Sequence, residues 1–188
     1  MKLLSIDVGI KNLSYCYAEI DGNELQNINI LRWKNISITD KNCNKMGIND
    51  CIESMMNAMK NEFDEIDVDK VIIENQPGNI NKTMKSLSIV IYSYFVFNNK
   101  KVEFISAFNK LKTNKCKELL KSSKMYNIKK YSDRKKLSID VAKYYVETYF
   151  NEYIDIFVKK AKRGSAIKKD DLADALLYVI YFVECVRK

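Results

Sequence analysis

The chain has 188 residues, of which 47% are hydrophobic and 30% charged, and its formal net charge is +8. This size and composition predict a single globular domain over residues 1–188 and exclude a disordered tail. Histidine is absent, which excludes Ser–His and Cys–His nucleophiles, histidine metal ligands and histidine general bases. An enzyme with this sequence must therefore work through carboxylates, lysines and bound metal.

Neither a membrane span nor a secretory signal is expected. The longest apolar stretches, residues 87–97 and 175–183, are shorter than the ~20 residues that a spanning helix needs. Asp7 interrupts the only apolar run at the N-terminus. The five cysteines are scattered without a CxxC pair, which is typical of reduced thiols in a cytosolic protein and not of a disulfide frame or zinc site.

The first part of the chain predicts four strands and one helix. The expected strands cover residues 2–7, 13–20, 25–33 and 68–74, and the helix covers residues 50–63. Asp21-Gly22 favours a hairpin turn between the second and third strands. Residues 34–49 are expected to form a flexible insertion.

The second part predicts three helices and one strand, the helices over residues 81–98, 133–150 and 170–186 and the strand over residues 101–107. The β-branched and aromatic content of the first helix also allows a strand there, and Asp133 is the expected N-cap of the second. A meander followed by βαβ units predicts an α/β protein. Its mixed five-stranded sheet would be antiparallel in the first three strands, parallel in the last two and flanked by helices.

The positive charge is concentrated in two segments. Residues 109–136 contain eleven basic and two acidic residues, and residues 159–169 contain six basic residues and no acidic one. The rest of the chain is acidic, so the basic residues are placed in a way that suits a polyanion. A solvated lysine-rich loop is the alternative interpretation of either segment alone.

Four carboxylates occupy positions where they could meet. Asp7 ends the first strand and Glu74 ends the fourth, and groups at the carboxyl ends of adjacent strands gather at one edge of an open sheet. Asp171 and Asp174 are three residues apart and project from the same side of the last helix. Acids at a helix start also favour the helix dipole, but Asp174 lies further in, between Ala173 and Ala175, whose small side chains allow close approach to the sheet.

Clustered carboxylates repel one another unless cations lie between them. An oxygen-only ligand set favours Mg²⁺, with Mn²⁺ able to substitute. Two such ions can activate a water and neutralise a scissile phosphate. Beside basic segments, this chemistry indicates phosphodiester hydrolysis.

Several segments resemble the poxvirus Holliday junction resolvases, relatives of the bacterial RuvC and fungal mitochondrial resolvases. They are LLSIDVGIKNLSYC, VIIENQP, FISAFNKLK, YSDRKKLSIDVAKYY and KKDDLADALLY, in this order from end to end. The resemblance implies an RNase H-like fold and symmetric, Mg²⁺-dependent nicking of four-way and branched DNA, with two ions per site and no nucleotide cofactor. For the poxviruses, it further implies a role in resolving DNA concatemers during replication and recombination, in the host cell cytoplasm.

The resemblance also assigns residues. The catalytic, metal-binding acids fall on Asp7, Glu74, Asp171 and Asp174, and Asp170 is an extra acid beside them. Lys110 is the candidate for the lysine that the related resolvases use near the site. The expected DNA-binding residues are Lys112, Lys115, Lys129, Lys130, Arg134, Lys135, Lys136, Lys168 and Lys169. A homodimer is implied as well, since a two-fold junction offers two equivalent strands.

Three alternatives remain open from sequence. A ribonuclease H acting on RNA–DNA hybrids would use similar acids but must recognise the 2′-hydroxyl. An actin-like or sugar-kinase ATPase shares the IDVGIKN pattern, yet only five glycines are present and no two lie close together. A module that binds branched DNA without cutting it would use the basic segments but gain nothing from the acids.

Overall fold

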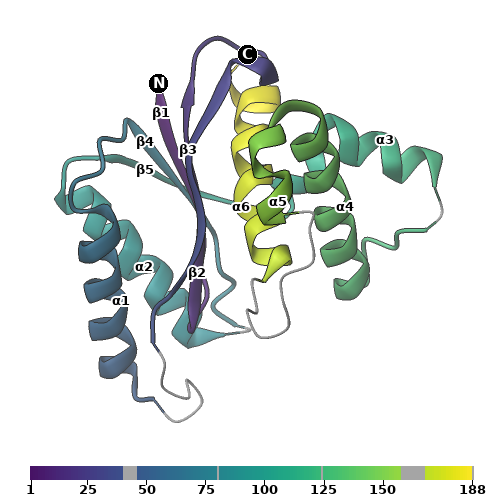
Figure 1. Cartoon of the computed structure of the whole chain (residues 1–188). Coiled ribbons are helices and arrows are strands. Elements are labelled where there is room, and N and C mark those ends of the chain that lie inside the picture. The colour runs from purple at the N-terminus through teal and green to yellow at the C-terminus, as the bar shows by residue number, and fades with distance from the viewer. Residues whose placement is uncertain (40–45, 80, 124, 158–167, 188) are drawn as a thin grey trace.

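The computed structural model describes residues 1–39, 46–79, 81–123, 125–157 and 168–187. A five-stranded sheet separates two groups of helices (Figure 1). The strands are β1 Lys2–Asp7, β2 Asn12–Ile20, β3 Ile28–Ser37, β4 Lys70–Glu74 and β5 Lys101–Ile105. The α-helices are α1 Ile48–Phe63, α2 Lys82–Phe97, α3 Asn114–Ser122, α4 Tyr131–Tyr149, α5 Ile154–Phe157 and α6 Lys169–Tyr181. Shorter helical turns are η1 Leu25–Asn27, η3 Asn109–Lys112, η4 Asn151–Tyr153 and the π-helix η5 Phe182–Val186.

The sheet has the strand order β3-β2-β1-β4-β5. β1 pairs antiparallel with β2 and parallel with β4, and β4 pairs parallel with β5. The predicted mixed sheet and α/β class are therefore confirmed. β1 lies at the centre, and its residues Leu3 to Ile6 are buried because helices cover both faces.

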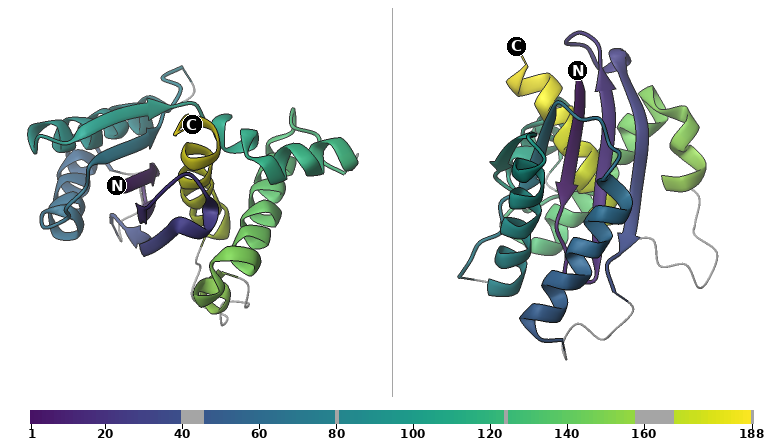
Figure 2. Two further views of the ribbon diagram at one scale, coloured as in Figure 1. Left: turned by 90° about the horizontal axis from the view of Figure 1, so that it is seen from above. Right: turned by 90° about the vertical axis from the view of Figure 1, so that its left-hand side faces the viewer.

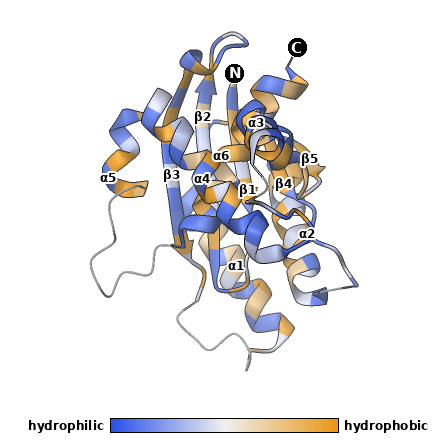
Figure 3. Ribbon diagram, turned by 90° about the vertical axis from the view of Figure 1, so that its right-hand side faces the viewer, coloured by the Kyte–Doolittle hydropathy of each residue, from blue (hydrophilic) through white to orange (hydrophobic). Residues whose placement is uncertain are grey.

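Two apolar layers hold the helices on the sheet. On one face, α1 buries Cys51, Met55, Met59 and Phe63, four residues apart along one stripe, and α2 packs beside it. On the other face, α6 lies directly against β1 and β2, and α4 packs on the outer side of α6 (Figure 2). In Figure 3, orange hydrophobic colouring covers much of α6 and also appears on α1, α5 and β5. No helix in the described ranges is both long and apolar enough to span a membrane.

Several predicted boundaries change in the structure. The third strand begins at Ile28 instead of residue 25, because η1 occupies Leu25–Asn27, and it continues to Ser37 into the expected insertion. Of that insertion, residues 40–45 lie outside the described residues, residues 46–47 lead into α1, and residues 48–49 are its first two residues. Residues 82–97 form a helix and not a strand, since the Asn81 side chain caps it by accepting a hydrogen bond from the backbone N–H of Met84.

The prediction that Asp133 is an N-cap is wrong. α4 begins two residues earlier, at Tyr131, which leaves Asp133 within the first turn, where its carboxylate accepts a hydrogen bond from the backbone N–H of Asn127. The segment between β5 and α4, expected as a basic connection, contains η3 and α3. The sixth helix is α-helical only to Tyr181 and continues as η5.

Candidate active site

The carboxyl ends of β1 and β4 lie side by side, as the sequence predicts. The two strands run parallel with Ile6 opposite Ile73, so the next residues, Asp7 and Glu74, emerge at the same edge of the sheet. Gly9 allows the chain to turn directly after Asp7, because a Cβ atom there would lie 2.4 Å from the carbonyl oxygen of Asn12.

Helix α6 is fixed across this edge by two side chains of the sheet. The hydroxyl of Ser5, on β1, donates to the Ala175 carbonyl at 2.6 Å, and the indole N–H of Trp33, on β3, donates to the Leu172 carbonyl at 3.0 Å. Ala173 and Ala175 are fully buried, as expected for small residues that let the helix approach the strands. The two anchored carbonyls flank Asp174, which sets its position relative to Asp7.

Lys110, in the helical turn η3 that follows β5, extends into the acid cluster. Its ammonium forms an ion pair with Asp174 and lies 3.6 Å from Glu74 Oε2. All three side chains are largely buried, between 11% and 14% exposed. A single lysine thus supplies positive charge to Glu74 and Asp174. The charges of these three residues and of Asp171 also act on Asp7.

Glu74 has two further partners. The Tyr178 hydroxyl, on α6, donates to Oε2, and the Gln76 side-chain amide donates to Oε1 at 3.3 Å. Neither Tyr178 nor Gln76 is among the site residues predicted from the sequence. Because Tyr178 is fully buried, its hydroxyl fixes the carboxylate from the side of the core.

Burial raises the pKa values of Asp7 and Asp174. Burial first, and then the charges of Glu74 and Asp174, raise the pKa of Asp7 well above its ordinary value. Burial also raises the pKa of Asp174 to about 6, although Lys110 opposes this. Burial acts to lower the pKa of Lys110, but the charges of Asp174 and Glu74 outweigh it and raise that pKa. The cluster therefore attracts a cation.

Asp170 and Asp171 have different surroundings. Asp170 forms an ion pair with Lys135 of α4; burial alone would raise its pKa, but the hydrogen bond and charge of Lys135 lower it. Burial, and then the charge of Asp170, raise the pKa of Asp171, which also interacts electrostatically with Asp7. Of the two neighbouring acids, Asp171 is the one that joins the Asp7 cluster electrostatically.

The residues suit a divalent cation, although the described part of the chain holds no ready-made group of three or more acids or cysteines at metal-binding geometry. The Lys110 ammonium instead lies against Glu74 and Asp174. Asp174 Oδ1 is buried and makes no hydrogen bond of ordinary geometry, although the Ser138 hydroxyl acts to lower the pKa of Asp174. A buried carboxylate oxygen without a full partner is costly, and a bound cation would remove that cost. An all-oxygen donor set with one such atom fits Mg²⁺ or Mn²⁺.

The predicted DNA-binding residues differ in exposure and in their partners. Lys112, Lys129, Lys130, Lys136 and Lys168 are exposed, and Lys169 is half-buried. Lys168 lies 3.7 Å from Asp171, whereas Lys115 pairs with Glu118 and lies over the Tyr144 ring. Of the second basic segment, residues 159–167 lie outside the described residues.

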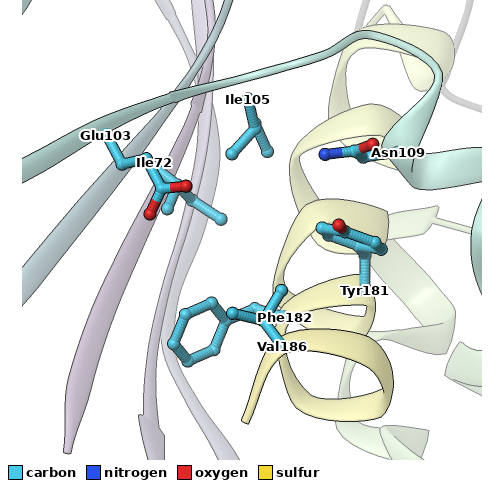
Figure 4. A pocket seen from close by; sticks show the side chains of 7 residues that line it. All are labelled: Ile72, Glu103, Ile105, Asn109, Tyr181, Phe182 and Val186. Carbon is cyan, nitrogen blue, oxygen red and sulfur yellow. The ribbon is translucent and has the colours of Figure 1, made fainter.

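A small cavity lies between the end of α6 with η5 and strands β4 and β5 (Figure 4). Its volume is about 30 Å³, and Ile72, Ile105 and Phe182 are among its lining residues. None of the clustered acids lines it. The acids therefore lie outside this cavity.

Comparison with known proteins agrees with this architecture. Residues 3–93 match the family model of the mitochondrial resolvase Ydc2 / RNA splicing MRS1 family. The uncharacterized protein L451 of Acanthamoeba polyphaga mimivirus is 30% identical over 145 residues, which are 70% of this chain and 32% of that protein. The chain thus spans about a third of the length of the curated relative it matches.

Solved structures share the fold. The fowlpox virus resolvase, solved with Holliday junction DNA, is 21% identical with a TM-score of 0.69, and the alignment covers 100% of both chains. The yeast mitochondrial Holliday junction resolvase Ydc2 is 17% identical with a TM-score of 0.58, over 97% of this chain and 78% of that one. Thermus thermophilus RuvC is 12% identical with a TM-score of 0.59, over 96% and 95%. The RNase H-like fold is confirmed, as is the resemblance to this group of proteins.

Proposed function

We propose that this protein is a Holliday junction resolvase of the RuvC-like group, an endonuclease that makes paired nicks in four-way DNA junctions. The observation that carries the proposal is the convergence of Asp7, Glu74, Asp174 and Lys110 at one edge of the sheet, in a chain that resembles resolvases over its length. Asp171 completes the set of acids. A module that only bound DNA would gain nothing from burying these acids, since carboxylates repel phosphate.

The chain's own residues have separable roles in this proposal. Asp7, Glu74, Asp171 and Asp174 would hold the divalent ions, with Asp174 Oδ1 free to accept one. Bound there, such ions would activate water and neutralise the scissile phosphate. Lys110 provides a buried positive charge and N–H donors beside the acids, suited to stabilise negative charge on the phosphate.

Substrate selection would depend on the exposed basic residues. Contacts from lysine and arginine to phosphate position a duplex without reading its sequence. Recognition of a junction would then rest on the shape of the DNA. Two such sites in a homodimer would match the two-fold symmetry of the junction and place one nick in each of two equivalent strands.

The test is cleavage of a labelled mobile four-way junction by the wild-type protein, with and without Mg²⁺ or Mn²⁺. Linear duplex and an RNA–DNA hybrid of the same length serve as control substrates. We expect paired nicks at symmetric positions, dependent on the metal and absent from both controls.

Two results would contradict the proposal. Preferential cutting of the hybrid would assign the acids to a ribonuclease H activity. A junction that is bound but remains intact in both metals would leave only the binding module. The oligomeric state is measured separately by sedimentation, where a dimer is expected.

A further inference from the structure

Two aromatic side chains next to the acid cluster are largely exposed. Phe108 is 55% exposed and Tyr131 is 64% exposed. Phe108 follows β5 two residues before Lys110, and Tyr131 is the first residue of α4. Large aromatic rings at the surface are a cost that binding of a partner can offset.

The two rings share one arginine. The Arg134 guanidinium carbon lies 5.7 Å from the centre of the Phe108 ring and 5.6 Å from that of Tyr131. One of its nitrogens donates to the backbone carbonyls of Ile128, at 2.8 Å, and Lys129, at 3.3 Å. Arg134 is therefore fixed to the backbone and holds the two rings in a preformed group, which we call the aromatic–arginine platform (Phe108, Tyr131, Arg134).

The platform adjoins the acid cluster at both ends. At one end, Phe108 and Lys110 belong to the same turn after β5. At the other, the Lys135 ammonium lies 5.0 Å from the centre of the Tyr131 ring and pairs with Asp170, the neighbour of Asp171. A strand whose phosphate lies at the acids would therefore have its neighbouring nucleotides close to the platform.

We propose that the aromatic–arginine platform stacks against unpaired or unstacked bases of the DNA strand that enters the active site. Every base has a π-face, so rings with an adjacent cation bind bases without regard to sequence. The branch point of a junction is where bases lose their stacking neighbours. The inference rests on the proposed function and adds to it a feature of the DNA that the site would recognise.

The charge around the platform favours DNA as its occupant. Lys129, Lys130 and Lys136 are exposed nearby on the same segment. The acid in the first turn of α4, Asp133, is engaged by the backbone N–H of Asn127. An acidic polymer with flat apolar groups matches this surface, whereas a purely apolar protein partner would leave the cations without counter-charges.

The experiment uses a four-way junction with 2-aminopurine at the nucleotides that flank the branch point, in EDTA so that it is not cut. Phe108→Leu and Tyr131→Leu remove a ring and keep apolar bulk. Phe97→Leu is the matched control, because Phe97 is 86% exposed at the far end of α2, away from the acids. Tyr131→Phe keeps the ring, and thermal melting verifies that each variant is folded.

We expect the wild type, Phe97→Leu and Tyr131→Phe to change the 2-aminopurine fluorescence equally. Phe108→Leu and Tyr131→Leu should reduce that change and weaken junction binding by at least about fivefold. Their salt dependence of binding should equal that of the wild type, because no phosphate contact is lost.

The outcomes separate the two proposals. Suppose that the wild type prefers and cuts junctions, and that the leucine variants match it in junction affinity and in the change of 2-aminopurine fluorescence. The platform then has no stacking role, and only this inference fails. If the wild type binds junction no better than linear duplex and cuts neither, the proposed function fails and the inference fails with it.

Discussion

The two faces of the sheet are packed with different kinds of side chains. On the α1–α2 face, the strand residues Leu4, Ile6 and Tyr15 pack against apolar helix residues, and the hydroxyl of Tyr15 reaches Glu62 at the margin. On the α6 face, polar side chains lie between the layers: Ser5 and Trp33 bind helix carbonyls, and Tyr178 binds Glu74. One face serves stability alone, while the other combines packing with the positioning of charged groups.

This difference indicates where substitutions should affect catalysis. The Glu62 carboxylate at the margin of the α1–α2 face is 20% exposed and is bound by Tyr15 and Lys34. On the α6 face, Asp7 and Asp174 are more deeply buried and have raised pKa values, as expected of a functional site that is less stable than it could be.

The largest contrast is expected for the same substitution on the two faces. Glu74→Gln should reduce junction cleavage by about a thousandfold, because a metal ligand contributes several kcal/mol to stabilising the transition state. Glu62→Gln, which alters a carboxylate bound by Tyr15 and Lys34, should leave the rate within about twofold. Single-turnover kinetics measure the cleavage rates of both variants. Equal losses of rate would show that carboxylates on the two faces do not differ in their importance for cleavage.

Packing substitutions should separate stability from activity. Met55 and Leu176 are both fully buried, on opposite faces. Each change to alanine should cost about 2–5 kcal/mol of unfolding free energy, measured by urea denaturation. Leu176→Ala should also slow cleavage, because α6 carries Asp171 and Asp174, whereas Met55→Ala should retain the rate per folded molecule. A cleavage defect in Met55→Ala would show that the α1–α2 face also shapes the site.

Removal of a single hydroxyl tests the positioning of Glu74. Tyr178→Phe should weaken the apparent Mg²⁺ affinity or the rate about 10–100-fold, the usual effect of losing a group that orients a ligand. Tyr94→Phe is the control, since the Tyr94 hydroxyl donates to Asp64 at 3.1 Å on the other face. A Mg²⁺ titration of the cleavage rate distinguishes affinity from maximal rate. If Tyr178→Phe behaves like Tyr94→Phe, the hydrogen bond to Glu74 is merely structural.

The smallest effect is expected in metal-free stability. The pKa of Asp7 is raised in the folded state, mainly by burial, so ionisation destabilises the fold as the pH rises above the unfolded pKa of about 4. Asp7→Asn removes this penalty and should raise the melting temperature in EDTA, by about 2–4 °C for each kcal/mol relieved. The gain should be larger at pH 8 than at pH 5. A lower melting temperature at pH 8 would mean that the charged form of Asp7 is stabilised in the fold.

Sequence patterns predicted the parts of this molecule that depend on the local order of apolar and polar residues along the chain. Asp7 and Glu74 could be placed because each ends an apolar run, and the strand pairing then brings them together. The helix α3 could not be found in the same way, since most of its residues are polar or charged and only Cys116 is buried. Asp133 has the right chemistry for an N-cap, but Tyr131 already begins the helix.

Individual side-chain contacts between distant segments could not be predicted from the sequence. The pairing of Asp170 with Lys135 depends on how α4 packs against α6. The hydrogen bond from Tyr178 to Glu74 joins residues 104 positions apart. Lysines looked equivalent along the basic segment, yet only the fold directs Lys110 to the acids and Lys115 to Glu118.

The most direct test of the account compares two neighbouring acids of α6. Asp174→Asn and Asp170→Asn are assayed together for cleavage and for binding of a labelled four-way junction in Mg²⁺. We predict that Asp174→Asn abolishes paired nicking and still binds the junction, and that Asp170→Asn, which loses only the ion pair to Lys135, cuts within about tenfold of the wild-type rate. Cleavage by Asp174→Asn at the wild-type rate would contradict the assignment of the acid cluster as the active site.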